Sequence, residues 1–279
     1  MSEETILKKL RKKIFLTGYS ASIAHLASAF SIVELLYVLY NHKILNYDSN
    51  NPNLDSRDRF ILSKGHGSLA FYTVLSSVGF FDEETLKTFS KPGSILGGEP
   101  CISIISGIEA TTGSLGHGLS LASGMALAKK LDGRKEKIYV LLGDGECEEG
   151  TIWEAIMFAV HYKLNNLIVI VDCNKIQKMS TLEKIMSIDS WKDKFLSFGC
   201  LVKEVDGHNI EELDRVFKEK NDSDKPLVIL ANTIKGKGVS IIENDPRWHW
   251  RLPNKKELKI FMKELDISEE EILECKKLI

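Results

Sequence analysis

The chain of 279 residues is 43% hydrophobic and 27% charged, which allows one substantial buried core. Its net charge of −2 argues against binding to nucleic acid or to an anionic membrane surface, because both attract strongly basic proteins. The apolar runs are only as long as strands, and the N-terminus lacks the apolar core of a signal peptide. The five cysteines are scattered without zinc-site spacing, which indicates reduced thiols. We therefore expect a cytoplasmic protein without a membrane span.

In the first half of the chain, the hydrophobic pattern predicts helices separated by loops. They are expected over residues 3–18, 31–40, 68–79, 82–89 and 119–131. Ser31 and Asp82 are candidate N-caps for two of these helices. Residues 46–60 are rich in Asn, Asp, Ser and Pro, which indicates a loop. Residues 91–118 are rich in glycine and poor in charge, which indicates a long functional loop rather than a disordered one.

From residue 137 onward, predicted strands alternate with predicted helices. The strands are expected over 137–142, 166–172, 201–207 and 226–234, and the helices between them over 150–164, 191–199 and 210–220. This alternation predicts right-handed βαβ units, and hence an α/β fold with three α/β/α layers around a mainly parallel sheet. Because no linker is evident, we expect a single domain over residues 1–279, in which about 254–279 form a peripheral helical tail.

A carboxylate and an amide follow two consecutive predicted strands. Asp144 lies in "GDG" after the first strand, and Asn174 lies in "CNKI" after the second. Adjacent parallel strands end at one edge of the sheet, where ligands bind in such folds. Carboxylate, amide and backbone carbonyl oxygens suit a hard cation such as Mg²⁺, and Gly143 and Gly145 let the backbone approach a phosphate. An ordinary turn capped by an aspartate is the alternative for "GDG" alone.

The stretch from "GDGECEEGTIWEA" to "DCNKI" resembles the thiamine diphosphate motif. The segments "LSKGHGSLAFY", "ATTGSLGHGLSLASGMALA" and "IKGKGVSIIENDPRWHW" resemble the N-terminal part of transketolases. The resemblance keeps its order over nearly the whole chain, and the chain most resembles the N-terminal subunit of a split transketolase. This resemblance implies the thiamine diphosphate-binding fold. It also implies thiamine diphosphate and Mg²⁺, or Ca²⁺ or Mn²⁺ in its place, as cofactors.

The resemblance also assigns roles around the cofactor. It implies that the metal ligands are the side chains of Asp144 and Asn174 and the backbone carbonyl of Ile176. It further implies that Gly145 and Asn174 contact the diphosphate. The loop residues expected to lie against the cofactor are Gly113, Ser114 and Leu115.

Three histidines fall in separate segments of the resemblance, which implies a catalytic role for each. His66 would lie near the reactive carbon and diphosphate of the cofactor, His249 near the diphosphate and a substrate oxygen, and His25 against the substrate. Histidine suits these places because ketol transfer moves protons on and off oxygens near neutral pH. A surface or core position is the alternative for each of them. The histidines that match no motif are expected to be structural: His42, His161 and His208.

Four glutamates follow the "GDG" turn, and they divide into two pairs. The resemblance implies that Glu149 and Glu154 reach a subunit interface and link paired active sites. Glu146 and Glu148 are instead expected to be helix N-terminal acids, which the helix dipole favours.

The chain departs from the family pattern on the substrate side. Glu99, in "GEP", replaces a histidine associated with recognition of a donor hydroxyl. An ionised carboxylate only accepts hydrogen bonds, whereas a neutral histidine can also donate one. Trp250 replaces a glycine after His249, and "LAS" stands after His25 where the family has "PGG". We therefore expect a donor ketose, or a binding pose, that differs from those of the usual pentose and hexose phosphates.

The resemblance implies transfer of a two-carbon ketol unit from a ketose to an aldose, with sugars or sugar phosphates as substrates. It implies a partner, a C-terminal transketolase subunit with the pyrimidine-binding domain, in a heterotetramer with two copies of each chain. We expect no activity without this partner. The alternatives are another thiamine diphosphate enzyme half, similar to deoxyxylulose phosphate synthase or a keto-acid dehydrogenase, and a non-catalytic cofactor-binding or regulatory protein. Both the pentose phosphate pathway and the synthesis of an unusual sugar stay open.

Overall fold

The computed structural model describes residues 1–22, 25–102 and 105–277. Within these residues, a five-stranded sheet has the order β1-β2-β3-β5-β4, and every pair of neighbouring strands is parallel. The strands are β1 Arg59–Leu62, β2 Ile138–Gly143, β3 Leu167–Cys173, β4 Leu201–Asp206 and β5 Leu227–Asn232. The four strands predicted after residue 137 are confirmed. The predicted loop over residues 46–60 was wrong for its last two residues, because β1 begins at Arg59.

The predicted helices are present in the predicted order, and the short helices α2 and α8 were not predicted. Their bounds are α1 Glu3–Ser20, α2 Leu26–Phe30, α3 Val33–Asn41, α4 Ser68–Ser77, α5 Glu83–Lys87, α6 His117–Leu131, α7 Gly150–His161, α8 Leu182–Ile185, α9 Trp191–Ser197, α10 Ile210–Lys218, α11 Lys255–Glu264 and α12 Glu269–Lys277. The short 3₁₀ turns are η1 Gly65–Gly67, η2 Gly145–Glu148 and η3 Pro246–Trp248. The Asp82 side chain accepts from the Thr85 N–H, as predicted for an N-cap. Ser31 is not a cap, because its hydroxyl donates to the Ser28 carbonyl and to Asp172 instead.

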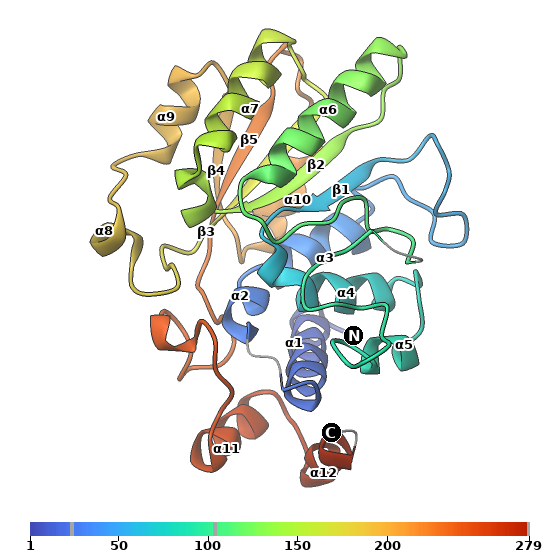
Figure 1. Cartoon of the computed structure of the whole chain (residues 1–279), viewed down its shortest axis with the longest axis vertical. Coiled ribbons are helices and arrows are strands. Elements are labelled where there is room, and N and C mark those ends of the chain that lie inside the picture. Colours follow the sequence, from blue (N-terminus) through green and yellow to red (C-terminus); the bar gives the residue numbers. More distant parts are fainter. Residues whose placement is uncertain (23–24, 103–104, 278–279) are drawn as a thin grey trace.

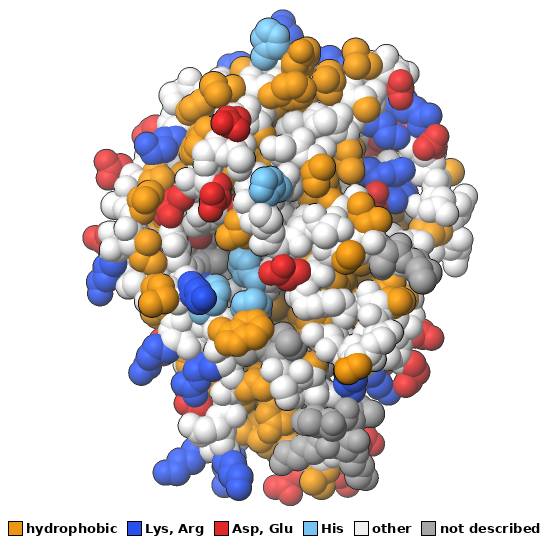
Figure 2. Space-filling model, viewed as in Figure 1, with side chains coloured by type: hydrophobic (Ala, Val, Ile, Leu, Met, Phe, Trp, Pro, Cys, Tyr) orange, Lys and Arg blue, Asp and Glu red, His pale blue; other side chains and the backbone are white. Residues whose placement is uncertain are grey.

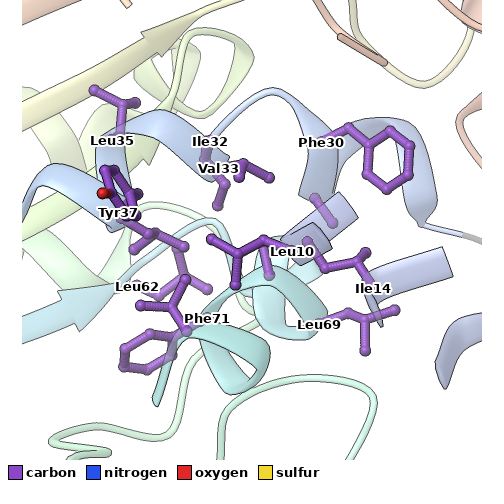
Figure 3. Close-up of a cluster of buried hydrophobic side chains, with 14 of the residues drawn as sticks. Leu10, Ile14, Phe30, Ile32, Val33, Leu35, Tyr37, Leu62, Leu69 and Phe71 are labelled. Atoms are coloured by element: carbon purple, nitrogen blue, oxygen red, sulfur yellow. The ribbon is translucent and has the colours of Figure 1, made fainter. Parts of the chain in front are cut away.

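Two apolar layers lie on opposite faces of the sheet, as side chains alternate along each strand. Tyr139 and Leu141 join the core that includes α1, α3, α4 and α10, whereas Val140 and Leu142 join the core that includes α6, α7 and α9. Figure 1 shows the helices on both sides of the sheet. Figure 3 shows the first core, where side chains from α1, α3 and α4 interlock beside Leu62 of β1. The predicted three-layer α/β/α fold is therefore confirmed.

The last two helices pack at the end of the molecule away from α6 and α7 (Figure 1). In α11, Phe261 is fully buried, and its ring stacks on Phe15 of α1 with 4.7 Å between centroids. A capping box between Asn254 and Glu257 begins α11. These contacts fix the C-terminal helices on α1. No helix among the described residues is long and apolar enough to cross a membrane.

Candidate active site

The residues predicted to bind a metal meet at the carboxyl edge of the sheet. Because β2 and β3 are paired in parallel, Asp144 and Asn174 follow neighbouring strand ends. The Asp144 carboxylate accepts a hydrogen bond from the Lys175 N–H, and the Asn174 amide oxygen accepts one from the Ile176 N–H at 3.1 Å. Both side chains are buried. The predicted juxtaposition is confirmed, whereas metal binding itself stays a prediction.

Glycines let three backbone segments approach closely at this edge. A Cβ atom on Gly65 would lie 2.8 Å from the Cα of Gly113, so the turn before His66 packs directly on the glycine-rich loop. Gly113 has a φ of +123°, a value that side-chain-bearing residues rarely adopt. A Cβ on Gly145 would lie 2.9 Å from the Gln177 side chain. The predicted loop residues Ser114 and Leu115 continue from Gly113 towards α6.

Glu146 fastens these segments together, and the prediction that it is only a helix N-terminal acid was wrong. Its carboxylate is buried in η2 and accepts hydrogen bonds from the Ser63 hydroxyl, the Gly116 N–H at 2.9 Å and the Gly143 N–H at 3.1 Å. These three partners follow β1, precede α6 and end β2, respectively. Glu146 therefore satisfies backbone donors that a glycine-rich loop would otherwise leave unpaired. Glu148 accepts from the Gln177 side chain at 2.7 Å.

The three predicted histidines converge although they come from distant parts of the chain. The ring centroids of His25 and His66 are 5.7 Å apart, those of His25 and His249 5.3 Å, and those of His66 and His249 5.9 Å. Figure 2 shows histidine side chains gathered at the surface of this face, next to an acidic side chain. The predicted grouping is confirmed as geometry, and a catalytic role for each histidine stays a proposal.

All three histidines are held in the neutral form. Burial, followed by the positive charge of Lys235, lowers the pKa of His25 to about 4 and that of His249 to about 3. Burial and then Lys64 lower the pKa of His66 well below its usual value. A neutral imidazole can both donate and accept a hydrogen bond, so the cluster can bind hydroxyl and carbonyl oxygens near pH 7.

Lys235 is a site residue that the sequence analysis did not single out. Its ammonium group is buried and donates to the Ile176 carbonyl at 2.9 Å, and it lies 3.2 Å from Nδ1 of His249. Among the described residues, no carboxylate forms an ion pair with it. Burial, followed by the charge of Lys64, lowers the pKa of Lys235 to about 8, so it still carries a positive charge at pH 7. The Asp144 and Asp172 carboxylates act on this cation only without direct contact, so the site has room for a further negative charge beside Lys235.

Asp172 connects the metal residues to the rest of the site. Its fully buried carboxylate forms an ion pair with Lys64 and accepts hydrogen bonds from the Asn174 amide at 2.8 Å and from the Thr233 hydroxyl. The bond to Asp172 fixes the Asn174 amide so that its oxygen faces away from Asp172. Lys64 precedes the turn that carries His66, so one carboxylate holds the histidine turn, the amide and the end of β5 together.

The other predicted residues lie around this centre. The Glu99 carboxylate packs on Gly113, since a Cβ there would fall 1.8 Å from its Oε2. Glu149 lies beside Gly116, and both Glu149 and Glu154 are exposed. Trp250 is 54% exposed, with its ring 4.2 Å from that of His25. Glu99 thus lies against the glycine-rich loop and Trp250 against the histidine cluster.

A cavity of about 1150 Å³ opens on another side of the metal residues. It lies between residues 175–190 and the carboxyl ends of β4 and β5, and its lining includes Asp144, Asn174 and His208. The histidine cluster does not line it. The predicted metal ligands Asp144, Asn174 and Ile176 therefore all line this cavity.

A parallel sheet with buried oxygen ligands, close-approach glycines and a buried lysine at its carboxyl edge defines a cofactor-binding α/β enzyme domain. The model of the family "Transketolase, thiamine diphosphate binding domain" matches residues 19–274. The chain belongs to this transketolase family, and it is therefore part of a transferase.

The relatives include transketolase subunits of similar length and longer transketolase chains. The chain is 41% identical over 247 residues to one subunit of the apulose-4-phosphate transketolase of Phocaeicola vulgatus, covering 88% of this chain and 87% of that one. It is 43% identical over 222 residues to a 6-deoxy-6-sulfo-D-fructose transketolase subunit of a Clostridium species, covering 79% and 80%. The crystal structure of the Campylobacter jejuni transketolase superposes with a TM-score of 0.85 at 28% identity, and this chain spans 47% of its length.

Proposed function

We propose that this chain is the thiamine diphosphate-binding subunit of a two-subunit transketolase, which transfers a two-carbon ketol unit from a ketose to an aldose. The observation that supports this function best is the buried Lys235 ammonium, which has no carboxylate partner among the described residues and lies beside the Ile176 carbonyl and His249. A diphosphate would supply the missing negative charge. Thiamine diphosphate, when bound, provides the nucleophilic carbon for breaking and forming carbon–carbon bonds.

The residues at the carboxyl edge fit a diphosphate and a divalent cation. Asp144, the Asn174 oxygen and the Ile176 carbonyl form the oxygen set that Mg²⁺ prefers. Gly145 would approach the diphosphate, and the Gly113 to Leu115 loop would lie against the organic part of the cofactor. The Ile176 carbonyl, which now accepts from Lys235, would bind the cation, and the Lys235 ammonium would bind the diphosphate.

The histidines would handle the protons of the substrate. As neutral imidazoles, His25, His66 and His249 can hold substrate hydroxyl and carbonyl oxygens and exchange protons with them. Glu99 and Trp250, at the edge of the histidine cluster, would determine which donor ketoses bind. Because Glu99 carries a negative charge where the family has a histidine, we propose that it alters the choice of donor ketose.

We expect the chain to bind thiamine diphosphate only with a divalent cation, and an Asp144→Asn variant to bind it at least about tenfold more weakly. Burial, and then the nearby Asp172 carboxylate, raise the pKa of Asp144 to about 7. A cation must displace that proton, so binding should weaken as the pH falls below about 7. Isothermal calorimetry with Mg²⁺, and then with a chelator, measures both effects.

Two controls make the calorimetry specific. Thiamine without its diphosphate should bind far more weakly, because the proposed contacts are to the diphosphate. An Asp189→Asn variant, which changes an exposed carboxylate on the loop over the cavity, should bind like the unmodified chain. Equal affinity for thiamine diphosphate with and without the cation, or in the Asp144→Asn chain, would contradict the assigned metal site.

A second chain is needed for the proposed activity. The relatives named above are called subunits. On this chain, apolar side chains are exposed on the outer faces of α6 and α7: Leu121 is 44% exposed, Met157 53% and Tyr162 44%. Orange side chains gather over these helices in Figure 2. We propose that a C-terminal subunit with the pyrimidine-binding domain covers this surface and meets Glu149 and Glu154, in a heterotetramer with two copies of each chain.

Purification from the native lysate with thiamine diphosphate and Mg²⁺ should yield a stoichiometric companion, and only the complex should transfer the ketol unit. In that complex, a Glu99→His variant should rank donor ketoses differently from the unmodified chain. Mass spectrometry identifies the companion, and a coupled assay with a panel of ketoses measures the ranking. Turnover by this chain alone would contradict the two-subunit proposal. An unchanged ranking of donor ketoses would show that Glu99 does not determine which donor is preferred.

A further inference from the structure

A buried ionic network lies beside the proposed cofactor site and has no part in the function described so far. Arg11 of α1 donates through Nη2 to both carboxylate oxygens of Glu34 in α3, at 2.7 and 2.8 Å. Glu34 also bonds to Nδ1 of His208, which follows β4, at 3.1 Å. The side chains are only 5–10% exposed. Burial opposes ionisation of Glu34, but Arg11 and His208 outweigh it and lower its pKa. The network is therefore a charged one inside the protein.

The hydrogen bonds fix the protonation state of His208. Its Nε2 accepts a hydrogen bond from the Ile234 N–H at 2.8 Å, so this nitrogen carries no proton. Nδ1 must then carry the proton that is donated to Glu34. His208 is thus a neutral imidazole that donates to the Glu34 carboxylate through Nδ1 and accepts from the Ile234 N–H through Nε2.

This amide belongs to the segment that carries Lys235. Ile234 directly precedes the lysine, and its N–H is held by His208. Two residues beyond the lysine, the Lys237 carbonyl accepts from Nε of Arg11 at 2.7 Å. The same network therefore holds the chain on both sides of Lys235. The Lys235 side chain itself is not bonded to this network and contacts Ile176 and His249 instead.

We propose that Arg11, Glu34 and His208 are positioning residues, which hold the backbone around Lys235 so that its ammonium lies at the diphosphate end of the site. The backbone is held at Ile234 and at Lys237, three residues apart, and has little freedom to rotate between them. This fixes the direction in which the Lys235 side chain leaves the backbone. The expected effect of this network on thiamine diphosphate binding rests on the proposed function. Its effect on the position of Lys235 does not depend on that function.

Two variants of His208 separate its two hydrogen bonds. In His208→Asn, the side-chain amide can still donate to Glu34, but nothing replaces Nε2 as the acceptor for the Ile234 N–H. In His208→Gln, the longer amide places an oxygen where Nε2 lies and keeps that acceptor. If the network positions Lys235, the asparagine variant should disturb it and the glutamine variant should not.

The test is acetylation of Lys235 by a short pulse of acetic anhydride in the whole cofactor-free chain, quantified by peptide mass spectrometry. The unmodified lysine should react slowly, because it is buried between Ile176 and His249. We expect His208→Asn to accelerate the acetylation about tenfold and to weaken thiamine diphosphate binding by a similar factor. His208→Gln should stay close to the unmodified chain in both measurements.

His42 provides a matched control, because both of its ring nitrogens are also hydrogen-bonded, at 2.9 Å to Asp214 and 2.8 Å to Glu3, but neither partner belongs to the lysine segment. His42→Asn should leave Lys235 acetylation unchanged. If His208→Asn does not fold, Arg11→Lys replaces it, since a lysine can pair with Glu34 but cannot also reach the Lys237 carbonyl. That variant too should accelerate the acetylation.

Unchanged acetylation in the folded His208→Asn chain would overturn the proposal, and so would equal acceleration in His42→Asn. The failure of the proposed function would look different. In that case the unmodified chain would not bind thiamine diphosphate at all, and the acetylation ratios alone would still decide whether the network positions Lys235.

Discussion

An Asp172→Asn variant should lose about 3–5 kcal/mol of the free energy of unfolding, because it leaves a buried lysine without its partner. Lys64 and Asp172 both have fully buried side chains, so water cannot replace the missing carboxylate. The carboxylate also accepts from Ser31 at 2.8 Å, and an asparagine cannot satisfy all of these donors. Urea unfolding followed by circular dichroism at pH 7 measures the loss.

Two further variants show whether the unpaired charge is the cause. Adding Lys64→Met to the Asp172→Asn chain removes that charge and should restore a large part of the lost stability. Lys192→Met breaks an ion pair to Glu204 in which both side chains are exposed, so it should have little effect on the free energy of unfolding. If Asp172→Asn costs no more than Lys192→Met, the buried pair does not hold the site together.

Replacing Gly65 by alanine should weaken thiamine diphosphate binding about a hundredfold, because a shift of about 1 Å in a site has an effect of that size. The new Cβ would lie 2.8 Å from both the Cα and the N of Gly113. These are backbone atoms, which cannot rotate away, so the histidine turn and the glycine-rich loop must separate. The free energy of unfolding should also fall, by about 1–3 kcal/mol.

Gly124 in α6 provides the matched control for the Gly65→Ala substitution. A Cβ there has no atom within 4 Å, and the position is exposed. Gly124→Ala should therefore raise stability by up to about 1 kcal/mol, as alanine favours a helix, and leave cofactor binding unchanged. Calorimetry and thermal unfolding of the two alanine variants make the comparison. Similar affinities for the cofactor in both would show that close packing of Gly65 on Gly113 is unimportant for binding.

Much of the sheet and the metal edge could be predicted because the pattern there is strong. Between β2 and β5, strands alternate with helices, and this alternation permits few arrangements other than a parallel sheet. Once β2 and β3 are neighbours, Asp144 and Asn174 must share an edge. The grouping of the histidines came from the family resemblance instead, since no periodicity connects residues so far apart in the chain.

The groups that were missed are charged residues in the interior. Lys64, Lys235 and Glu146 are buried, although lysine and glutamate are normally exposed, and composition does not indicate which ones are enclosed. For Lys235 a signal was present, as it lies between a buried strand and a glycine, at the edge where parallel sheets bind ligands. β1 was missed because four residues after a polar loop are too few to show a pattern.

The contact between Arg11 and the Lys237 carbonyl spans 226 positions in the sequence, which has a consequence for biosynthesis. On the ribosome, the helices at the start of the chain emerge long before β2, β3 and β5 exist to cover their apolar faces. Contacts that join such distant segments form late and make folding slow. We therefore expect the nascent chain to expose a large apolar surface until β5 has been synthesised, and newly made protein to depend on chaperones more than the folded protein does.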